Sequence, residues 1–346
     1  MKHFALCCLI AALLVAVNAQ GVERMRQPVA AGVFYPEEPD ALLAKLNELY
    51  AQAEDVPPAT HRLAACVVPH AGYDYSGKIL AKAFESLKPG QYDRVIVLAP
   101  GHMTEPEGCS IVAADAYITP FGPVYLDQKT IRTLCYSSNF TSRNLQYNNQ
   151  NNRVPLHEVE HSIEVILPML QERLQRFWLI PIIVGNISGA DKKVDAGRIR
   201  VIADRIRKIM TPRTLLVVST DYTHYGNSFS YTPFRDNIAE NISTLDTQAF
   251  TLILSKDLEG FKKYLRTTKN PICGASALQV MMELLPESTV GSLLDYNRSM
   301  TQDNDGTRSI SYASMHFYDM RHPPNDIPVP VPEAQNTATP EPEPVE

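Results

Sequence analysis

The sequence predicts an α/β fold: one layered domain with a central, mostly parallel but mixed sheet that is flanked by helices. Short apolar runs rich in β-branched residues alternate along the chain with segments of helical periodicity, which is the pattern of such layered domains. The 346 residues are 45% hydrophobic and 20% charged, an ordinary globular composition and enough chain to bury a large core. We find no internal repeat and no linker that would divide this core.

Four apolar runs have the length and composition of strands that are buried on both faces. They are bounded by residues that typically end strands. The single tryptophan, Trp178, stands near the start of the third run, and we expect it to be buried there. The four predicted strands are residues 63–68, 94–99, 177–185 and 214–219.

Between and around these runs, apolar residues recur at intervals of three and four, as they do on helices that cover a sheet. Two later segments, residues 289–297 and 309–318, fit antiparallel strands and would make the sheet mixed. His316 in the second of them is expected to be a core or edge histidine with its hydrogen bonds satisfied. The predicted helices are residues 40–53, 77–87, 160–174, 198–210 and 276–285.

Residues 1–19 have the three parts of a secretory signal peptide. Lys2 gives a basic start, an apolar run extends from Phe4 to Val17, and Val17-Asn18-Ala19 offers a small-residue cleavage site. The run of about fourteen residues is shorter than the roughly twenty that a transmembrane helix needs. We therefore expect an exported protein, periplasmic or secreted, with no transmembrane span.

The other end, residues 323–346, is rich in proline and glutamate and contains no aromatic residue. Such a composition cannot bury enough apolar surface to offset the entropy of ordering, so we expect a disordered tail. The domain is thus expected to occupy residues 20–322. Because the tail carries a large part of the net charge of -6, the domain itself is close to neutral, which gives no electrostatic reason to expect nucleic-acid binding.

The cysteines left after removal of the signal peptide allow two disulfides in an exported protein, but their wide and irregular spacing is not typical of a disulfide framework. Cys66 lies inside an apolar run and is expected to be a buried small hydrophobe. Cys109 and Cys135 stand far apart in the sequence, which does not decide whether they pair. Asn-x-Ser/Thr sequons occur at Asn139, Asn186, Asn241 and Asn297 and matter only in a eukaryotic host.

A histidine stands at or just beyond the carboxyl end of each of three predicted strands. His70 stands in Pro-His-Ala-Gly, His102 in Pro-Gly-His, and His224 in "STDYTHYG", which also contains Asp221. Open α/β sheets bind ligands at the carboxyl ends of their strands. The accompanying Gly and Pro residues allow close approach of backbone to a ligand or fix a turn. These positions therefore predict a site at one rim of the sheet.

Cys273 stands in "NPICGASALQV", just before a predicted helix. A helix amino terminus favours the thiolate, which binds metals or attacks electrophiles. Two histidines and a thiolate are a suitable ligand set for Zn, Cu or Fe. A buried cysteine with no role remains the alternative on spacing alone.

An ordered set of motifs resembles the Memo family, labelled in microbial genomes as AmmeMemoRadiSam system protein B. The resemblance extends from about Pro28 to Tyr318 and is specific through the order of its motifs. The motifs are "GVFYP", "PHAGYDYSG", "LAPGHM", "YxTPFGPV", "EHSIEVILP", "IPIIVG", "STDYTHYG" and "ICG".

The resemblance implies a fold similar to that of the class III, non-haem iron extradiol dioxygenases. It implies an iron or copper ion bound by His70, His102 and Cys273. His224 matches the acid/base of the family, with Asp221 beside it. Matches to the residues that line the cleft imply a substrate-binding set of Phe34, Tyr73, Tyr75, Glu160 and His161.

The chain departs from this family pattern at Phe34, where relatives carry tryptophan, and at Met103, where a second histidine is usual. A cysteine ligand in place of the carboxylate of true extradiol dioxygenases favours a softer or more oxidised metal. Ring cleavage therefore does not follow directly from the resemblance.

The resulting prediction is an iron- or copper-dependent, dioxygenase-like redox enzyme of unknown substrate. The main alternative is a non-catalytic module that binds a small molecule or a peptide in the same cleft. The family resemblance also implies a functional link to AMMECR-type and radical SAM proteins. A further alternative is an exported zinc protease, since His157, Glu158 and His161 match H-E-x-x-H, although Pro155 places His157 at or before a helix start.

Overall fold

The computed structural model describes residues 23–53, 60–142, 145–147, 153–187, 196–303 and 306–323. The expected signal peptide, residues 1–19, and residues 324–346 of the expected tail lie outside the described residues. Within the described part of the chain, no helix combines the length and the apolar character that crossing a membrane requires.

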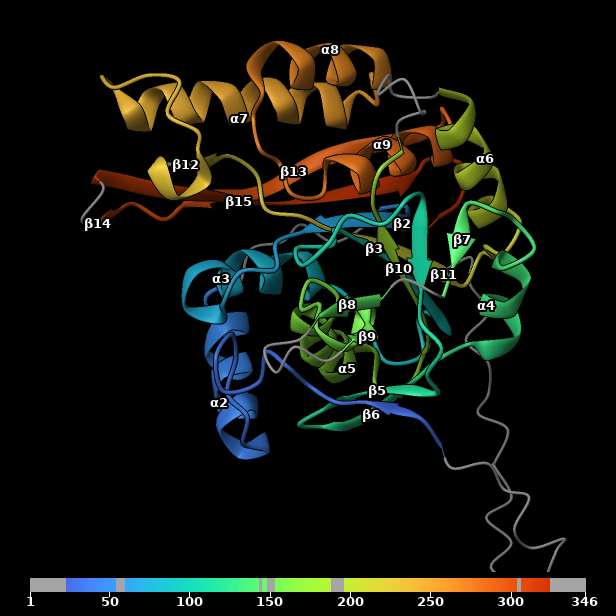
Figure 1. Ribbon diagram of the computed structural model, residues 1–346. Helices are drawn as coiled ribbons and strands as arrows, with labels where there is room; N and C mark the ends of the chain where they lie inside the picture. The colour runs from blue at the N-terminus through green and yellow to red at the C-terminus, as the bar shows by residue number, and fades with distance from the viewer. Residues whose placement is uncertain are drawn as a thin grey trace, which may run out of the picture.

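The fold is built around a central mixed sheet, as predicted (Figure 1). Its middle consists of four parallel strands in the order β2, β11, β3, β10, and all four predicted apolar runs are found there. Their core side chains are buried on both faces, which explains the continuous apolar runs. The bounds are β2 Arg62–Val68, β11 Thr214–Ser219, β3 Arg94–Ala99 and β10 Trp178–Val184.

Antiparallel strands extend both sides of this parallel middle. Beyond β2, the strand β15 (Gly306–Asp319) pairs with β2 and also with β13 (Thr289–Arg298), which confirms the two predicted late strands. Short strands β12 (His224–Tyr225) and β14 (Thr301–Asp303) also pair with β15. Beyond β10 lie β4 (Cys109–Ile111) and β7 (Phe140–Thr141).

The remaining described strands form two small sheets. The first contains β1 (Met25–Arg26), β5 (Ala116–Thr119) and β6 (Gly122–Tyr125). The second contains β8 (Leu145–Tyr147) and β9 (Arg153–Pro155).

Helices pack around the sheet with their apolar sides inward. Helix α3 contacts β2, β13 and β15, helix α9 contacts β11 and α6, and α7 lies with α8 above the β13–β15 pair (Figure 1). The bounds are α2 Pro39–Ala51, α3 Tyr73–Phe84, α4 Gln128–Leu134, α5 Leu167–Leu174, α6 Ala196–Arg207, α7 Ile238–Leu254, α8 Leu258–Thr268 and α9 Ala275–Leu284.

The helix predicted for residues 160–174 is wrong over its first half. Residues 160–163 are not helical, and a 3₁₀ turn, η2 (Glu164–Ile166), leads into α5. Glu160 and Glu164 in this stretch are buried and accept hydrogen bonds from backbone N–H groups of other segments. These tertiary contacts override the helical periodicity of the apolar residues.

Two predictions about single residues have different outcomes. His316 is buried, with Nε2 bonded to the carbonyl of Ala83 and Nδ1 bonded to the hydroxyl of Tyr318, as expected. Trp178, expected to be buried, is 53% exposed, because as the first residue of β10 it stands at the rim of the sheet.

Cys66 and Cys109 are buried, Cys135 is exposed, and all three are free thiols.

Candidate metal centre

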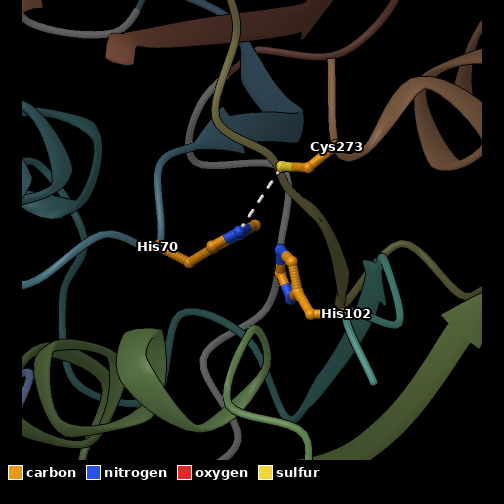
Figure 2. Close-up of side chains that lie close together, drawn as sticks. All are labelled: His70, His102 and Cys273. Atoms are coloured by element: carbon orange, nitrogen blue, oxygen red, sulfur yellow. Dashed lines mark hydrogen bonds between the residues drawn. The ribbon is translucent and has the colours of Figure 1, made fainter. Parts of the chain in front are cut away.

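The predicted site residues meet at the carboxyl ends of the parallel strands. His70 follows β2, His102 follows β3, and Asp221 follows β11, while Cys273 comes from the segment that leads into α9. In Figure 2 the side chains of His70, His102 and Cys273 point toward one another from these separate segments. The topology therefore places three potential metal ligands at one rim of the sheet.

The hydrogen bonds of His70 define which of its ring nitrogens carries the proton. Its Nδ1 lies 2.7 Å from the hydroxyl oxygen of Ser219, and that hydroxyl donates its own proton to the carbonyl of Ser162 at 2.7 Å. The Ser219 oxygen must therefore accept from Nδ1–H of His70. This leaves Nε2 of His70 unprotonated, with its lone pair directed at Cys273. Burial also lowers the pKa of His70 well below its ordinary value.

His102 is held by the buried carboxylate of Glu160. The two Glu160 oxygens accept from the backbone N–H of His102 at 2.5 Å and from its Nδ1 at 2.9 Å. Nε2 of His102 then faces Cys273. Burial disfavours the imidazolium, but the hydrogen bonds to Cys273 and Glu160 outweigh it and raise the pKa of His102 to about 10. A positive charge is therefore favoured beside the sulfur, either as a proton or as a metal ion.

Cys273 is drawn against the end of β11 by close backbone packing. Its Sγ lies 3.0 Å from the donating N–H of Asp221 and 3.5 Å from Nε2 of His70. The next residue, Gly274, donates its N–H to the hydroxyl of Thr220 at 2.9 Å. A Cβ on Gly274 would lie 2.4 Å from Cβ of Thr220, so a glycine is required for this approach.

The three side chains fit a metal ion. One ligand atom from each of His70, His102 and Cys273 lies within 4.8 Å of the other two. Nitrogen and sulfur ligands at ordinary bond lengths around one tetrahedral metal are roughly 3.6 Å apart. The 3.5 Å between Nε2 of His70 and Sγ of Cys273 agrees with this value. His102, Glu160 and His161 form a second group of potential ligands that shares His102 with the first.

His224 and Asp221 lie beside this group. Nδ1 of His224 donates to the carbonyls of Tyr222 at 2.7 Å and Pro271 at 3.0 Å, so backbone carbonyls orient the ring and Nε2 is the free acceptor. Burial lowers the pKa of His224, which keeps the ring neutral. Burial raises the pKa of Asp221 to about 7, although the backbone N–H groups of His70 and Ala71 partly oppose this shift.

A cavity of about 330 Å³ opens onto these residues. Aromatic rings and polar side chains line it, and Arg308 is the basic residue among them, with its guanidinium 4.9 Å from the centre of the Phe229 ring. Within the described part of the chain, Arg308 forms no ion pair. The lining residues are Phe34, His70, Ala71, Gly72, Tyr75, His102, His161, Asp221, His224, Phe229, Ser299, Thr301, Arg308, Ile310 and Tyr312.

The predicted substrate-binding residues are only partly brought together at this cavity. Phe34, Tyr75 and His161 line it, and the Phe34 and His161 rings are 4.6 Å apart. Tyr73 lies in the core instead, where its hydroxyl donates to the carbonyl of Val165 at 2.8 Å. Glu160 is buried behind His102 and acts through that ring.

The segment that brings Phe34 to the cavity is anchored by a buried ion pair. Arg26 and Glu164 are fully buried and paired with each other. Glu164 also accepts from the backbone N–H groups of Val29 and Ala30 and from the hydroxyl of Tyr35. One carboxylate therefore holds residues 26–35 in place beside the site.

The H-E-x-x-H motif does not form a zinc-protease site in this fold. His157 lies in the 3₁₀ turn η1 (Leu156–Glu158), is buried, and shares a hydrogen bond of 2.7 Å with the hydroxyl of Tyr117. His161 is outside that turn and stacks on His102, with 4.6 Å between ring centres. The two histidines thus have different partners, because the stretch is not the single helix that the motif requires.

Sequence reasoning missed several residues of the site. Ser219 is in the quoted "STDYTHYG" motif, and its place as the last residue of a predicted strand was a usable signal. Phe229, Ser299, Arg308 and Tyr312 come from segments whose relation to the site depends on the pairing of β12, β14 and β15. Their periodicity alone indicates strands and not a cavity wall.

Comparisons with known proteins match most of this chain to one family. The family model described as Memo-like protein matches residues 26–316. The human protein MEMO1 is 30% identical over 84% of this chain and 96% of its own length. The memo-1 homolog of Caenorhabditis elegans is 28% identical over 72% of this chain and 71% of its own length. Among solved structures, the uncharacterized protein JW3007 of Escherichia coli K12 superposes with a TM-score of 0.43 at 10% identity, covering 72% of this chain and 99% of that one.

Proposed function

Because the chain belongs to the Memo-like family, we propose that it is a metal-dependent, dioxygenase-like oxidoreductase that acts on a small molecule bound in the cavity. The observation that carries this proposal is the convergence of His70, His102 and Cys273 at the strand ends. The hydrogen bonds to Ser219 and Glu160 leave both imidazoles with Nε2 directed toward the sulfur.

The proposed metal is iron or copper. Imidazole nitrogen binds both, and a thiolate ligand favours copper or an oxidised iron over hard cations such as magnesium. When bound, the ion supplies Lewis-acid or one-electron redox chemistry next to the cavity.

His224 and Asp221 are the proposed proton carriers. The carbonyls of Tyr222 and Pro271 hold the proton of His224 on Nδ1, so Nε2 accepts a proton from a substrate hydroxyl. The pKa of about 7 that burial gives Asp221 suits a group that both gives and takes a proton near neutral pH.

The cavity wall favours a flat, anionic ligand. Phe34, Tyr75 and Phe229 offer ring faces, while Arg308 offers a positive charge that no described carboxylate neutralises. The volume of about 330 Å³ suits a small molecule. A small phenol or catechol that bears a carboxylate combines these features.

The first experiment measures metal content of anaerobically purified protein by elemental analysis. We expect near-stoichiometric iron or copper, lost in His70→Ala and in Cys273→Ala, and retained in His157→Ala, which alters a buried histidine outside the ligand group. Circular dichroism establishes that each variant is folded. Equal metal content in all four folded proteins would contradict the proposed site.

Oxygen uptake then separates an enzyme from a binding module. With a panel of carboxylated phenols and catechols, an enzyme consumes oxygen in a substrate-dependent way, and His224→Gln abolishes uptake while metal remains bound. If the compounds bind equally well to wild type and His224→Gln but no oxygen is consumed, the cavity serves binding alone.

We also propose export through residues 1–19 and a functional link to AMMECR-type and radical SAM proteins. The first rests on the sequence features of a signal peptide, and the second on family membership.

A further inference from the structure

A second hollow, remote from the metal centre, lies at the opposite end of the parallel strands. It has a volume of about 630 Å³, and its apolar wall includes Pro123, Tyr125, Phe177 and Trp178, while Asp93 contributes an acidic group. Trp178 is 53% exposed and Tyr125 is 44% exposed. Their ring centres are 6.5 Å apart. We call the hollow lined by these four residues and by Arg176 the Trp178 surface.

The Trp178 surface also offers unused hydrogen-bond donors. Among the described residues, nothing accepts from the indole N–H of Trp178, and Arg176 forms no ion pair. Adjacent aromatic rings with a free indole donor are the recognition surface for polyproline II segments, whose prolines stack on the rings and whose unpaired carbonyls accept hydrogen bonds. The surface therefore suits a proline-rich ligand.

The chain itself contains such a segment. Residues 323–346 contain eight prolines, and the first block, "IPVPVP", residues 327–332, alternates proline with aliphatic residues. This spacing favours polyproline II conformation and excludes a helix or a central strand.

The segment begins close to the Trp178 surface. The carbonyl of His322 accepts a hydrogen bond from the backbone N–H of Arg62, the first residue of β2. The amino ends of β2, β11, β3 and β10 lie side by side, with Thr214 opposite Arg94 and Arg94 opposite Trp178. Three strand spacings, roughly 14 Å, therefore separate the start of β2 from Trp178. Five residues of polyproline II extend about 15 Å, so Pro328 reaches the rings.

A basic hollow, lined partly by the residues before β11 and by the first residue of β3, also lies at these amino ends of the strands. Two more hollows continue from the Trp178 surface: the first shares Tyr125 and Trp178 with it, and the second shares Arg94 and Lys129 with the first. The first of them also carries the acids Glu23, Asp115 and Asp127, so positive charge is in excess only in the second. Four basic side chains and one acid, Asp127, line the last hollow; the bases are Arg94, Lys129, Arg205 and Lys208. In the segment, residues 333–346 follow the apolar block with four glutamates and no base.

We propose that residues 327–332 of this same chain bind on the Trp178 surface in polyproline II conformation, with the glutamates beyond them against the basic hollow. The proposal concerns the amino ends of the strands and is independent of the metal centre.

Trp178 is the only tryptophan of the chain, so its fluorescence reports on this surface alone. The full chain is compared with a chain that ends at Pro323, which retains every described strand and helix. We expect truncation to shift the emission to longer wavelength and to increase quenching by acrylamide about twofold or more, because the ring face then meets water. Adding a peptide of residues 323–346 to the truncated chain should reverse both changes.

Two controls test how the segment is recognised. A peptide with Pro328→Gly, Pro330→Gly and Pro332→Gly keeps the charges and should not reverse the changes. The Tyr125→Ala variant keeps Trp178 but lacks the neighbouring ring. In this variant the emission and the quenching of Trp178 should differ much less between the full and truncated chains.

Equal emission and quenching in full and truncated chains of confirmed fold would overturn the proposal. A difference that grows with protein concentration would overturn it in favour of a second copy as the source of the segment. A third outcome is that the peptide binds the truncated chain, yet Trp178 is equally exposed to acrylamide in the full and truncated chains. That result would indicate that the surface binds a separate proline-rich protein. A signal that depends on residues 1–22 and not on the tail would assign the surface to that segment.

Discussion

At the scale of single residues, the site depends on partners that hold each ligand in one orientation. Ser219 accepts the Nδ1 proton of His70, since its own proton is donated to the carbonyl of Ser162. Outer partners of this kind set the tautomer of a metal-binding histidine and raise its basicity. Ser219 is thus a positioning residue that does not contact the cavity.

Replacing this hydroxyl gives the first prediction. Ser219→Ala removes the acceptor of His70 Nδ1–H, and we expect metal affinity to fall about 10- to 100-fold, in the range found for such outer partners. Competition with a chelator of known affinity measures the change. Ser314→Ala, which removes a buried hydroxyl with no partner among the described residues, serves as control and should leave affinity unchanged. Equal affinity in both variants would refute the role of Ser219.

The loop that leads into α9 illustrates the scale of elements. The approach of Gly274 to Thr220 brings Cys273 against the end of β11. Gly274→Ala places a methyl group where Thr220 and the carbonyl of Ser219 already lie, so the loop must move away from the strand. We expect a folded protein with strongly reduced metal content and faster alkylation of Cys273 by iodoacetamide. Wild-type metal content in this variant would show that the loop has room to adjust.

The segment of residues 26–35 depends on one buried ion pair. Arg26→Met leaves the Glu164 carboxylate buried without its partner, and we expect the free energy of unfolding to fall by about 3–5 kcal/mol. Urea denaturation measures this loss. The double variant Arg26→Met, Glu164→Gln removes the uncompensated charge and should recover part of the stability. If the double variant were less stable than the single one, the loss would come from packing and not from charge.

The elements that could be predicted from the sequence are those whose pattern is local. Strands β2, β3, β10 and β11 are continuous apolar runs, since both of their faces are buried. The stretch from Glu160 to Glu164 could not be predicted, because its backbone follows two carboxylates that accept hydrogen bonds from distant segments. Trp178 was misjudged because an apolar run does not show which of its residues stands at the rim.

The same distinction applies to the site. His70, His102, His224 and Cys273 could be found from strand ends and motifs. The wall that faces them could not, since Arg308 and Tyr312 reach the cavity only through the pairing of β15 with β2 and β12, which are far away in the sequence. Tyr73 stands in a motif of the site, but its ring points into the core because it begins α3 on the buried side.

At the scale of the whole molecule, buried neutral histidines link stability to pH. Burial lowers the pKa of His157 and of His316 to about 4, below the ordinary value of about 6.5. The unfolded chain takes up these protons below about pH 6.5 and the folded chain only near pH 4, so stability falls as the pH is lowered through this interval.

The fourth prediction concerns this interval. Each of the two histidines contributes at most about 1.4 kcal/mol per pH unit to the slope of unfolding free energy against pH. His316→Gln should make the slope between pH 6.5 and 4 shallower, as measured by urea denaturation at a series of pH values. His61→Gln, outside the core, should leave it unchanged. A slope that His316→Gln does not alter would show that other groups account for the acid sensitivity.

The parallel strands and the antiparallel strands of the sheet contribute different residues to the site. The candidate metal ligands His70 and His102 follow parallel strands, whereas Ser299, Arg308 and Tyr312 belong to the antiparallel ribbon around β15. Substitutions in the ribbon change what the cavity recognises and leave the residues around Cys273 untouched. Descendants of such a chain can therefore change the ribbon side of the cavity while they inherit the candidate metal ligands unchanged.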